Sequence, residues 1–181
     1  MKKSFLTIVA LVAITVSSFA QKQVSSKTHM KFFSTTPAED IEANNYKAVS
    51  TLDTSTGDLV FSVPMQSFEF EKALMQEHFN SKKFLNTKAN PKAKLKAKII
   101  NLGNVKFNTD GSYTANVEGD LTINGVTKPI KEKVTFKIEG EKINLTSKFN
   151  LTLADYEVAF KKGKPSTNIA KTVEVTVEAN F

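Results

Sequence analysis

The sequence predicts an all-β domain, an antiparallel barrel or sandwich with one inserted α-helix, and three observations predict it. Apolar and polar residues alternate along most of the chain, which is the period of a strand with one buried face. Turn sequences such as Asn124-Gly125 separate the alternating segments at short intervals. Residues 68–84 contain no glycine or proline and break the alternation, which favours a helix there.

The N-terminus has the features of a cleaved signal peptide. Two lysines stand near the start, residues 5–16 are apolar apart from two threonines, and residues 18–20 give a small-x-small cleavage site. An apolar run of roughly a dozen residues is too short for a membrane span of about 20. We therefore expect a signal peptide at residues 1–20 and an exported, periplasmic or secreted domain at residues 21–181.

The first third of the expected domain shows three strand-like segments. Residues 21–27 are polar, and we expect them to form a loose lead-in. Apolar and aromatic residues then concentrate in residues 28–34, 41–53 and 58–63. Thr54-Ser55-Thr56-Gly57 separates the last two segments and is typical of a hairpin turn.

The stretch that follows predicts a helix over residues 68–80. Phe68, Met75 and Phe79 are spaced by seven and four residues, so they fall on one helical face. Ser67 precedes this stretch and is a suitable N-cap.

The rest of the chain predicts five strands with clear period-two alternation. These are residues 92–99, 113–123, 130–138, 143–153 and 173–179. With three earlier segments, this gives eight strands around one inserted helix.

Glu132 departs from this alternation, because it falls on the apolar face of its strand, between Ile130 and Val134. A buried carboxylate without a partner is costly. Three interpretations are open: a place at a barrel mouth, pairing with a lysine, or contact with the polar head of a ligand.

The charge is positive, but its composition argues against sequence-specific nucleic-acid binding. The formal net charge is +7, and every basic residue is lysine. Nucleic-acid readers usually need arginine for bidentate contacts. Lys92, Lys94, Lys96 and Lys98 form a stripe on one strand face. Such a stripe protects an edge or aids solubility, and weak attraction to an anionic membrane surface is the alternative.

The residue types needed for catalysis are sparse. There is no cysteine, the only histidines are His29 and His78, and no serine lies in a G-x-S-x-G motif. No spacing resembles a metal site or a phosphate loop. We therefore expect no metal, no cofactor and no enzymatic activity.

The aromatic content leaves two kinds of interior open. The chain has 14 phenylalanines, three tyrosines and no tryptophan. Large side chains could fill a barrel of about eight strands completely. The inward-facing sets also include small residues such as Ala97 and Gly119, which could leave a cavity for a ligand.

Two segments carry a resemblance to a known family. One lies within residues 67–93 and includes Leu74-Met75-Gln76-Glu77-His78-Phe79-Asn80. The other, residues 119–129, reads Gly-Asp-Leu-Thr-Ile-Asn-Gly-Val-Thr-Lys-Pro. Both resemble the YceI-like family, whose hairpin follows the pattern G-x-L-T-[IL]-x-G-x-[TS]-[KR]-P. The resemblance extends over nearly the whole expected mature chain.

The resemblance implies an extended, lipocalin-like antiparallel barrel of eight strands around an apolar tunnel. It implies binding of a polyisoprenoid, an isoprenoid quinone or a fatty-acid-like chain, with periplasmic or secreted location, and homodimers among family members. On this basis we expect the ligand tunnel or its mouth to be lined by Phe61, Phe68, Leu74, Phe79, Leu121, Phe136 and Phe149. The competing hypothesis is a structural or stress-linked envelope protein with a filled core, acting through protein contacts.

Overall fold

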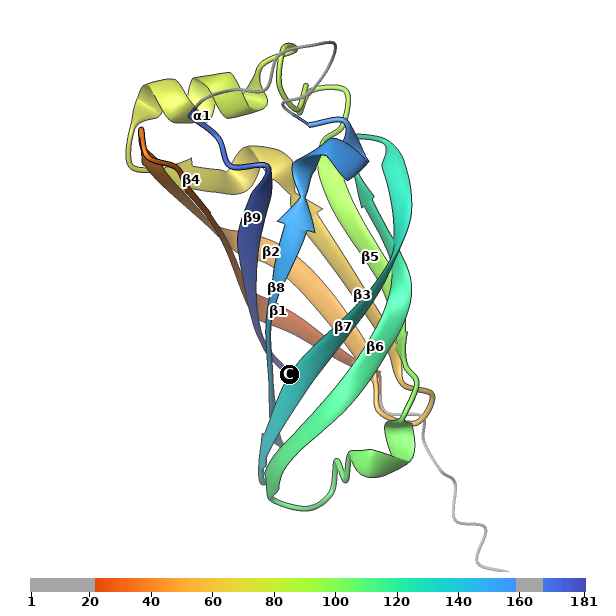
Figure 1. Cartoon of the computed structure of the whole chain (residues 1–181). Helices are drawn as coiled ribbons and strands as arrows, with labels where there is room; N and C mark the ends of the chain where they lie inside the picture. Colours follow the sequence, from red (N-terminus) through yellow and green to blue (C-terminus); the bar gives the residue numbers. More distant parts are fainter. Residues whose placement is uncertain (1–21, 159–167) are drawn as a thin grey trace, which may run out of the picture.

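Eight long strands close into an antiparallel barrel (Figure 1) in the computed structural model, which describes residues 22–158 and 168–181. The strands are β1 Lys22–Thr35, β2 Asp40–Asp53, β3 Asp58–Pro64, β5 Lys92–Ile99, β6 Gly111–Ile123, β7 Val126–Glu139, β8 Lys142–Thr152 and β9 Thr172–Asn180. Each pairs with its neighbours in this order, and β9 pairs with β1 to close the sheet. The predicted eight-stranded barrel is confirmed, whereas the expected signal peptide lies outside the described residues.

The first strand begins earlier than the sequence predicts. Residues 21–27 were expected to be a lead-in, but β1 starts at Lys22 and its first residues pair with the end of β2. The inward positions here are polar: Ser25 and Thr28 are buried, and Thr28 Oγ1 lies 2.9 Å from Ser50 Oγ. Because these inward side chains are not apolar, the alternation that reveals the other strands is absent.

The predicted helix over residues 68–80 is wrong in its first part. A 3-10 turn, η1 Met65–Ser67, leads into a short strand, β4 Phe68–Phe70, and the helix α1 runs only over Ala73–Asn80. Ser67 therefore does not cap it. Residues two apart lie on the same side of a strand, and β4 pairs with β2 so that Phe68 and Phe70 share one face. Both phenylalanines join the apolar interior, and this tertiary packing outweighs the helical spacing.

The lower end of the barrel, as drawn in Figure 1, is filled with side chains. The connection after β5, which contains the 3-10 turn η2 Leu102–Asn104, brings Val105 and Phe107 under this end. Phe107 packs edge-on against Phe136, with ring centroids 5.3 Å apart. A third 3-10 turn, η3 Leu153–Tyr156, follows β8 at the opposite end.

The lysine stripe does not protect an edge, because β5 lies between β3 and β6. Lys98 Nζ is 3.7 Å from Asp58 Oδ1, and Asp120 is the cross-strand neighbour of Lys96. Part of the stripe is therefore balanced by acidic side chains on both neighbouring strands. Within the described ranges, no helix is long and apolar enough to span a membrane.

Gly119 lies on β6 directly across from Ala97 on β5, where the two strands approach each other closely. A Cβ atom built on Gly119 would lie 2.3 Å from the Lys96 carbonyl oxygen and 2.5 Å from Ala97 Cβ. Backbone atoms cannot move aside as a flexible side chain can, so this strand pairing requires glycine. The small residues noted in the sequence therefore serve close strand packing here.

We predict that Gly119→Ala lowers the free energy of unfolding by about 1–3 kcal/mol, because the added methyl group forces the two strands apart. In a protein of this size each 1 kcal/mol lowers Tm by about 2–4 °C, which calorimetry resolves. Gly103→Ala is the matched control, since a Cβ there meets no atom within 4 Å. Equal Tm values for the two variants would contradict the close approach.

Candidate functional site

An apolar cavity of about 570 Å³ occupies the upper part of the barrel and extends to α1, whose Met75, His78 and Phe79 line it. Its wall runs from Leu145 in β8 to Leu153 just beyond that strand. This is about 26 Å along the chain, or about 20 Å of barrel height once the strand tilt is included. Below Leu145 the filled end of the barrel forms a floor. The interior is thus packed in one part and open in the other.

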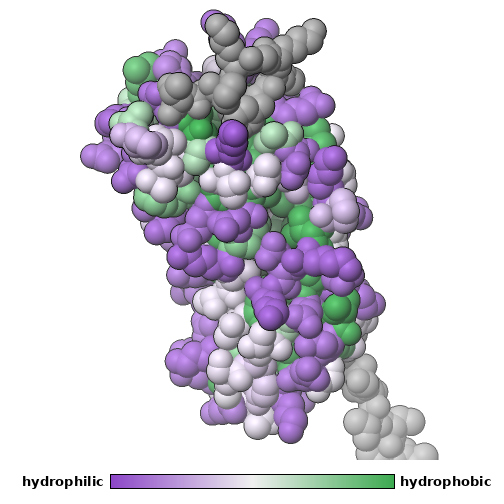
Figure 2. Space-filling view, viewed as in Figure 1, coloured by the Kyte–Doolittle hydropathy of each residue, from purple (hydrophilic) through white to green (hydrophobic). Residues whose placement is uncertain are grey.

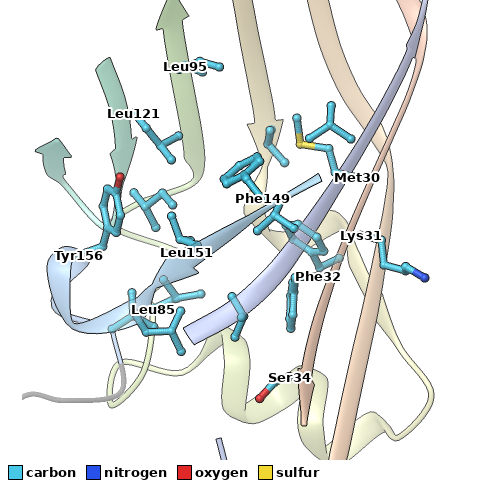
Figure 3. Close-up of a pocket in the computed structure, with 18 of the residues that line it drawn as sticks. Met30, Lys31, Phe32, Ser34, Leu85, Leu95, Leu121, Phe149, Leu151 and Tyr156 are labelled. Atoms are coloured by element: carbon cyan, nitrogen blue, oxygen red, sulfur yellow. The ribbon is translucent and has the colours of Figure 1, made fainter. Parts of the chain in front are cut away.

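Most of the cavity wall is hydrocarbon. All eight barrel strands contribute aliphatic or aromatic side chains to it, β2 and β5 by one residue each: Met30, Phe32, Ile41, Leu59, Phe61, Val63, Leu95, Val117, Leu121, Ile123, Ile130, Val134, Leu145, Phe149, Leu151, Val173, Val175 and Val177. Figure 3 shows Leu121 of β6 converging with Phe149 and Leu151 of β8, whereas the side chain of Lys31 points away from them. The Lys31 ammonium pairs with Glu42 at 3.4 Å instead.

Five phenylalanines gather at the mouth, between the ends of the strands and α1. Phe79 of α1 lies at the centre of this cluster, with ring centroids 5.0 Å from Phe70, 5.6 Å from Phe68 and 5.8 Å from Phe32. Phe84 follows at 6.1 Å from Phe79. Such aromatic contacts fix the short helix over the opening, although α1 is too short to be stable alone.

Polar contacts hold the rim around this cluster. Lys72, before α1, donates a hydrogen bond of 2.9 Å to Glu39, and this bond with the carboxylate raises the pKa of Lys72. Asn124, in the hairpin between β6 and β7, accepts a hydrogen bond from Asn90 at 2.9 Å and donates one to the Tyr156 carbonyl at 3.3 Å. Burial raises the pKa of the Tyr156 phenol, with a smaller contribution from Asp155.

Glu132 is an acidic group in the wall itself. It faces inward on β7, directly across from Val117 on β6, and is half-buried. Within the described part of the chain, no hydrogen bond or ion pair reaches its carboxylate. Burial raises the pKa of this carboxyl group. Of the three interpretations drawn from the sequence, pairing with a lysine is therefore wrong.

Five of the seven residues expected to line a ligand do line this cavity: Phe61, Phe68, Phe79, Leu121 and Phe149. Two do not. Leu74 lies on the outer side of α1 and is 61% exposed, because the helix is a single short cover with only Phe79 buried. Phe136 faces inward, but it is fully buried in the filled end below the cavity floor.

Sequence reasoning missed several lining residues in β1 and in the rim. Met30 and Phe32 line the cavity from β1, and Tyr156 and Ile169 from the segments before β9. The alternation of Met30 and Phe32 was available in the sequence, but nothing there showed which end of the barrel each strand position would occupy.

The two histidines occupy different settings. His29 stacks on Tyr46 with ring centroids 4.6 Å apart, and its Nε2 lies 2.9 Å from Asn44 Oδ1. His78 lies beside the cavity mouth on α1. Among the described residues, no group of three or more metal-ligating side chains comes together.

Comparison with known proteins places this geometry in a family. The sequence matches the YceI-like domain over residues 11–181. It is 32% identical over 108 residues to the UPF0312 protein of Pseudomonas putida strain W619, covering 56% of this chain and 51% of that protein. The UPF0312 protein of Pseudomonas syringae pv. tomato strain DC3000 is 34% identical over 110 residues, with the same coverage. The chain thus spans about half the length of these curated relatives.

Solved structures share the barrel. BcnA of Burkholderia cenocepacia superposes with a TM-score of 0.70 at 17% identity, covering 85% of this chain and 96% of that one. A polyisoprenoid binding domain from Saccharophagus degradans, implicated in plant cell wall breakdown, gives 0.73 at 11% identity, covering 88% and 96%. At these identities the likeness shows the fold alone.

We predict that Glu132→Gln raises Tm near neutral pH. A folded-state pKa above the unfolded value means that stability falls as the pH rises above the unfolded pKa, and the full cost of the ionised carboxylate is reached once the pH exceeds the raised pKa. The gain should disappear well below pH of about 4, where the carboxyl group is protonated in both states. Thermal unfolding of the variant and the wild-type protein across this pH range measures the difference in Tm. A Tm difference that is constant with pH would show that burial of the charge is not its cause.

Proposed function

The chain belongs to the YceI-like family, and from this premise we propose that it binds the apolar chain of a lipid inside its barrel. The observation that carries the proposal is the cavity, which is walled mainly by hydrocarbon side chains. Family membership and the polyisoprenoid binding domain among its structural neighbours support a binding protein rather than an enzyme.

The binding free energy would come mainly from burial of hydrocarbon. Each methylene group contributes about 0.8 kcal/mol when it leaves water. A tail of about ten carbons therefore gains about 8 kcal/mol, within the range of about 4–15 kcal/mol that association costs in lost freedom. Longer tails bind better until the cavity is full, and the contacts themselves do not distinguish an acyl chain from an isoprenoid.

The cavity floor limits the length of chain that fits. An extended chain rises about 1.2 Å per bond, so a cavity of about 20 Å holds a straight tail of about 16 bonds. A fatty acyl chain or a medium-length isoprenoid matches this depth. A longer polyisoprenoid or quinone tail must bend back or extend out of the barrel.

The competing hypothesis of a filled core describes only the lower end of the barrel, where Phe136 lies. We favour lipid storage or transport because the upper part is open. We also propose that the protein acts after export, in the periplasm or outside the cell, which the signal-peptide features of residues 1–20 support.

The direct test is lipid binding as a function of chain length. We predict that affinity for geraniol, farnesol and geranylgeraniol rises in that order, and that longer polyprenols gain little more, because the tail then exceeds about 16 bonds. Titration of delipidated protein by calorimetry measures the series, and mass spectrometry of the purified protein identifies any lipid carried along. Absence of affinity for every chain would refute the proposed function.

Filling the cavity should reduce capacity without unfolding the barrel. Leu121→Trp places a larger ring in the cavity, and we predict at least a fivefold loss of farnesol affinity, consistent with the cost of crowding a packed site. Val60→Trp is the matched control, because Val60 is on the outer face of β3 and already 38% exposed. Equal affinities in the two variants would place the lipid elsewhere.

A further inference from the structure

Two neighbouring strands of the barrel separate along the upper part of the cavity. The β7–β8 ladder joins Thr135–Glu139 to Lys142–Thr146. Above it, in the described structure, no pairing joins residues 126–134 of β7 to residues 147–152 of β8. Figure 1 shows the two strands diverging upwards from the hairpin that connects them. We call the stretch of wall between these two segments the window.

Side-chain contacts mark both ends of the window. At its lower end, Ser147 donates a hydrogen bond of 3.0 Å from its hydroxyl to the Lys133 carbonyl. At its upper end, the hydrogen bond from Asn124 to the Tyr156 carbonyl joins the β6–β7 hairpin to η3. The separation of the two strands is therefore a bounded feature of the fold, since contacts join the wall again above and below it.

The residues on both sides of the window belong to the cavity. Ile130 and Glu132 line it from β7, and Ser147, Phe149 and Leu151 line it from β8. All five are partly exposed, unlike their counterparts in the filled end. Figure 2, seen from the same side as Figure 1, shows strongly hydrophobic residues reaching the surface between hydrophilic ones over this part of the barrel.

Among the described residues, no basic side chain pairs with the Glu132 carboxylate at the window. Its neighbours Lys131 and Lys133 project from the opposite face of β7, and Lys131 is bound to Glu118 at 2.9 Å. On the inner face, Lys128 is the nearest basic residue of the same strand, four residues or about 13 Å away. The residue paired with Glu132 on β6 is Val117. On the other side of the window, the cavity-lining residues of β8 include Ser147 and Phe149.

We propose that the window holds the polar end of the bound lipid, and that Glu132 selects a cationic amine there. This inference rests on the proposed function, because the tail would occupy the cavity. An ammonium group would form a charge-assisted hydrogen bond with Glu132 and reach water through the window. A carboxylate or phosphate head would meet a like charge at the same place, and an alcohol could donate only a neutral hydrogen bond.

The test compares three ligands with the same tail: dodecylamine, dodecanol and laurate. The wild-type protein should bind dodecylamine about tenfold more tightly than dodecanol, and laurate more weakly than either. Glu132→Gln should remove the preference for the amine, because the amide carries no charge, while dodecanol should still bind through its tail. Glu118→Gln is the matched control, because it removes one carboxylate from the outer face of the adjacent strand and should retain the preference.

The outcomes separate the two proposals. If none of the ligands binds, the proposed function fails and the inference with it. If dodecanol binds but the amine has no advantage, or keeps its advantage in Glu132→Gln, only the assignment of Glu132 is overturned.

A second measurement locates the head without changing Glu132. The protein has no tryptophan, so Ser147→Trp introduces a single fluorophore at the window. A long-chain amine that carries a nitroxide near its head should quench this fluorescence more strongly than one that carries it near the chain end. Stronger quenching from the chain end would show that the tail, not the head, lies at the window.

Discussion

Closure of the sheet by the pairing of β1 with β9 is the constraint on which the rest of the structure depends. A ring of eight strands encloses a space so narrow that side-chain size decides whether it is filled. At one end Phe136, Ile138 and Leu145 meet and leave no room. At the other end β7 separates from β8, the ring widens, and the same kinds of side chain no longer meet across it. One closed sheet thus provides both a stable core and a cavity.

The site combines two forces of different character. Burial of hydrocarbon against the wall is strong but has no direction, so it sets the length of a ligand tail and says little about its identity. The carboxylate of Glu132 is directional, and its desolvation is costly unless a ligand or water offsets it. An unpaired acid in a mostly apolar wall costs some stability and offers a point of recognition. Glu132 is therefore one group in this wall from which chemical selectivity can arise.

The family hairpin of residues 119–129 acts mainly on structure. Gly119 permits the close approach of β5 and β6, and Asn124 connects the hairpin to Asn90 and to the carbonyl of Tyr156. These contacts fix the rim of the barrel and the upper end of the window. Only Leu121 and Ile123 of the hairpin face the cavity.

The sequence by itself determined the strands, because alternation has the same period as the pleat and each turn is local. It also identified Glu132 as anomalous, since a charge on an apolar face is visible without coordinates. It failed where packing outweighed local pattern. The start of β1 shows no apolar alternation because its buried residues, Ser25 and Thr28, are polar, and Phe68 and Phe70 form a strand rather than a helical turn. Only the tertiary structure showed that Phe136 packs below the cavity floor, that Leu74 is exposed to water and that the upper parts of β7 and β8 do not pair. Height within a barrel and the separation of two strands depend on the register of the whole ring, which no single segment encodes.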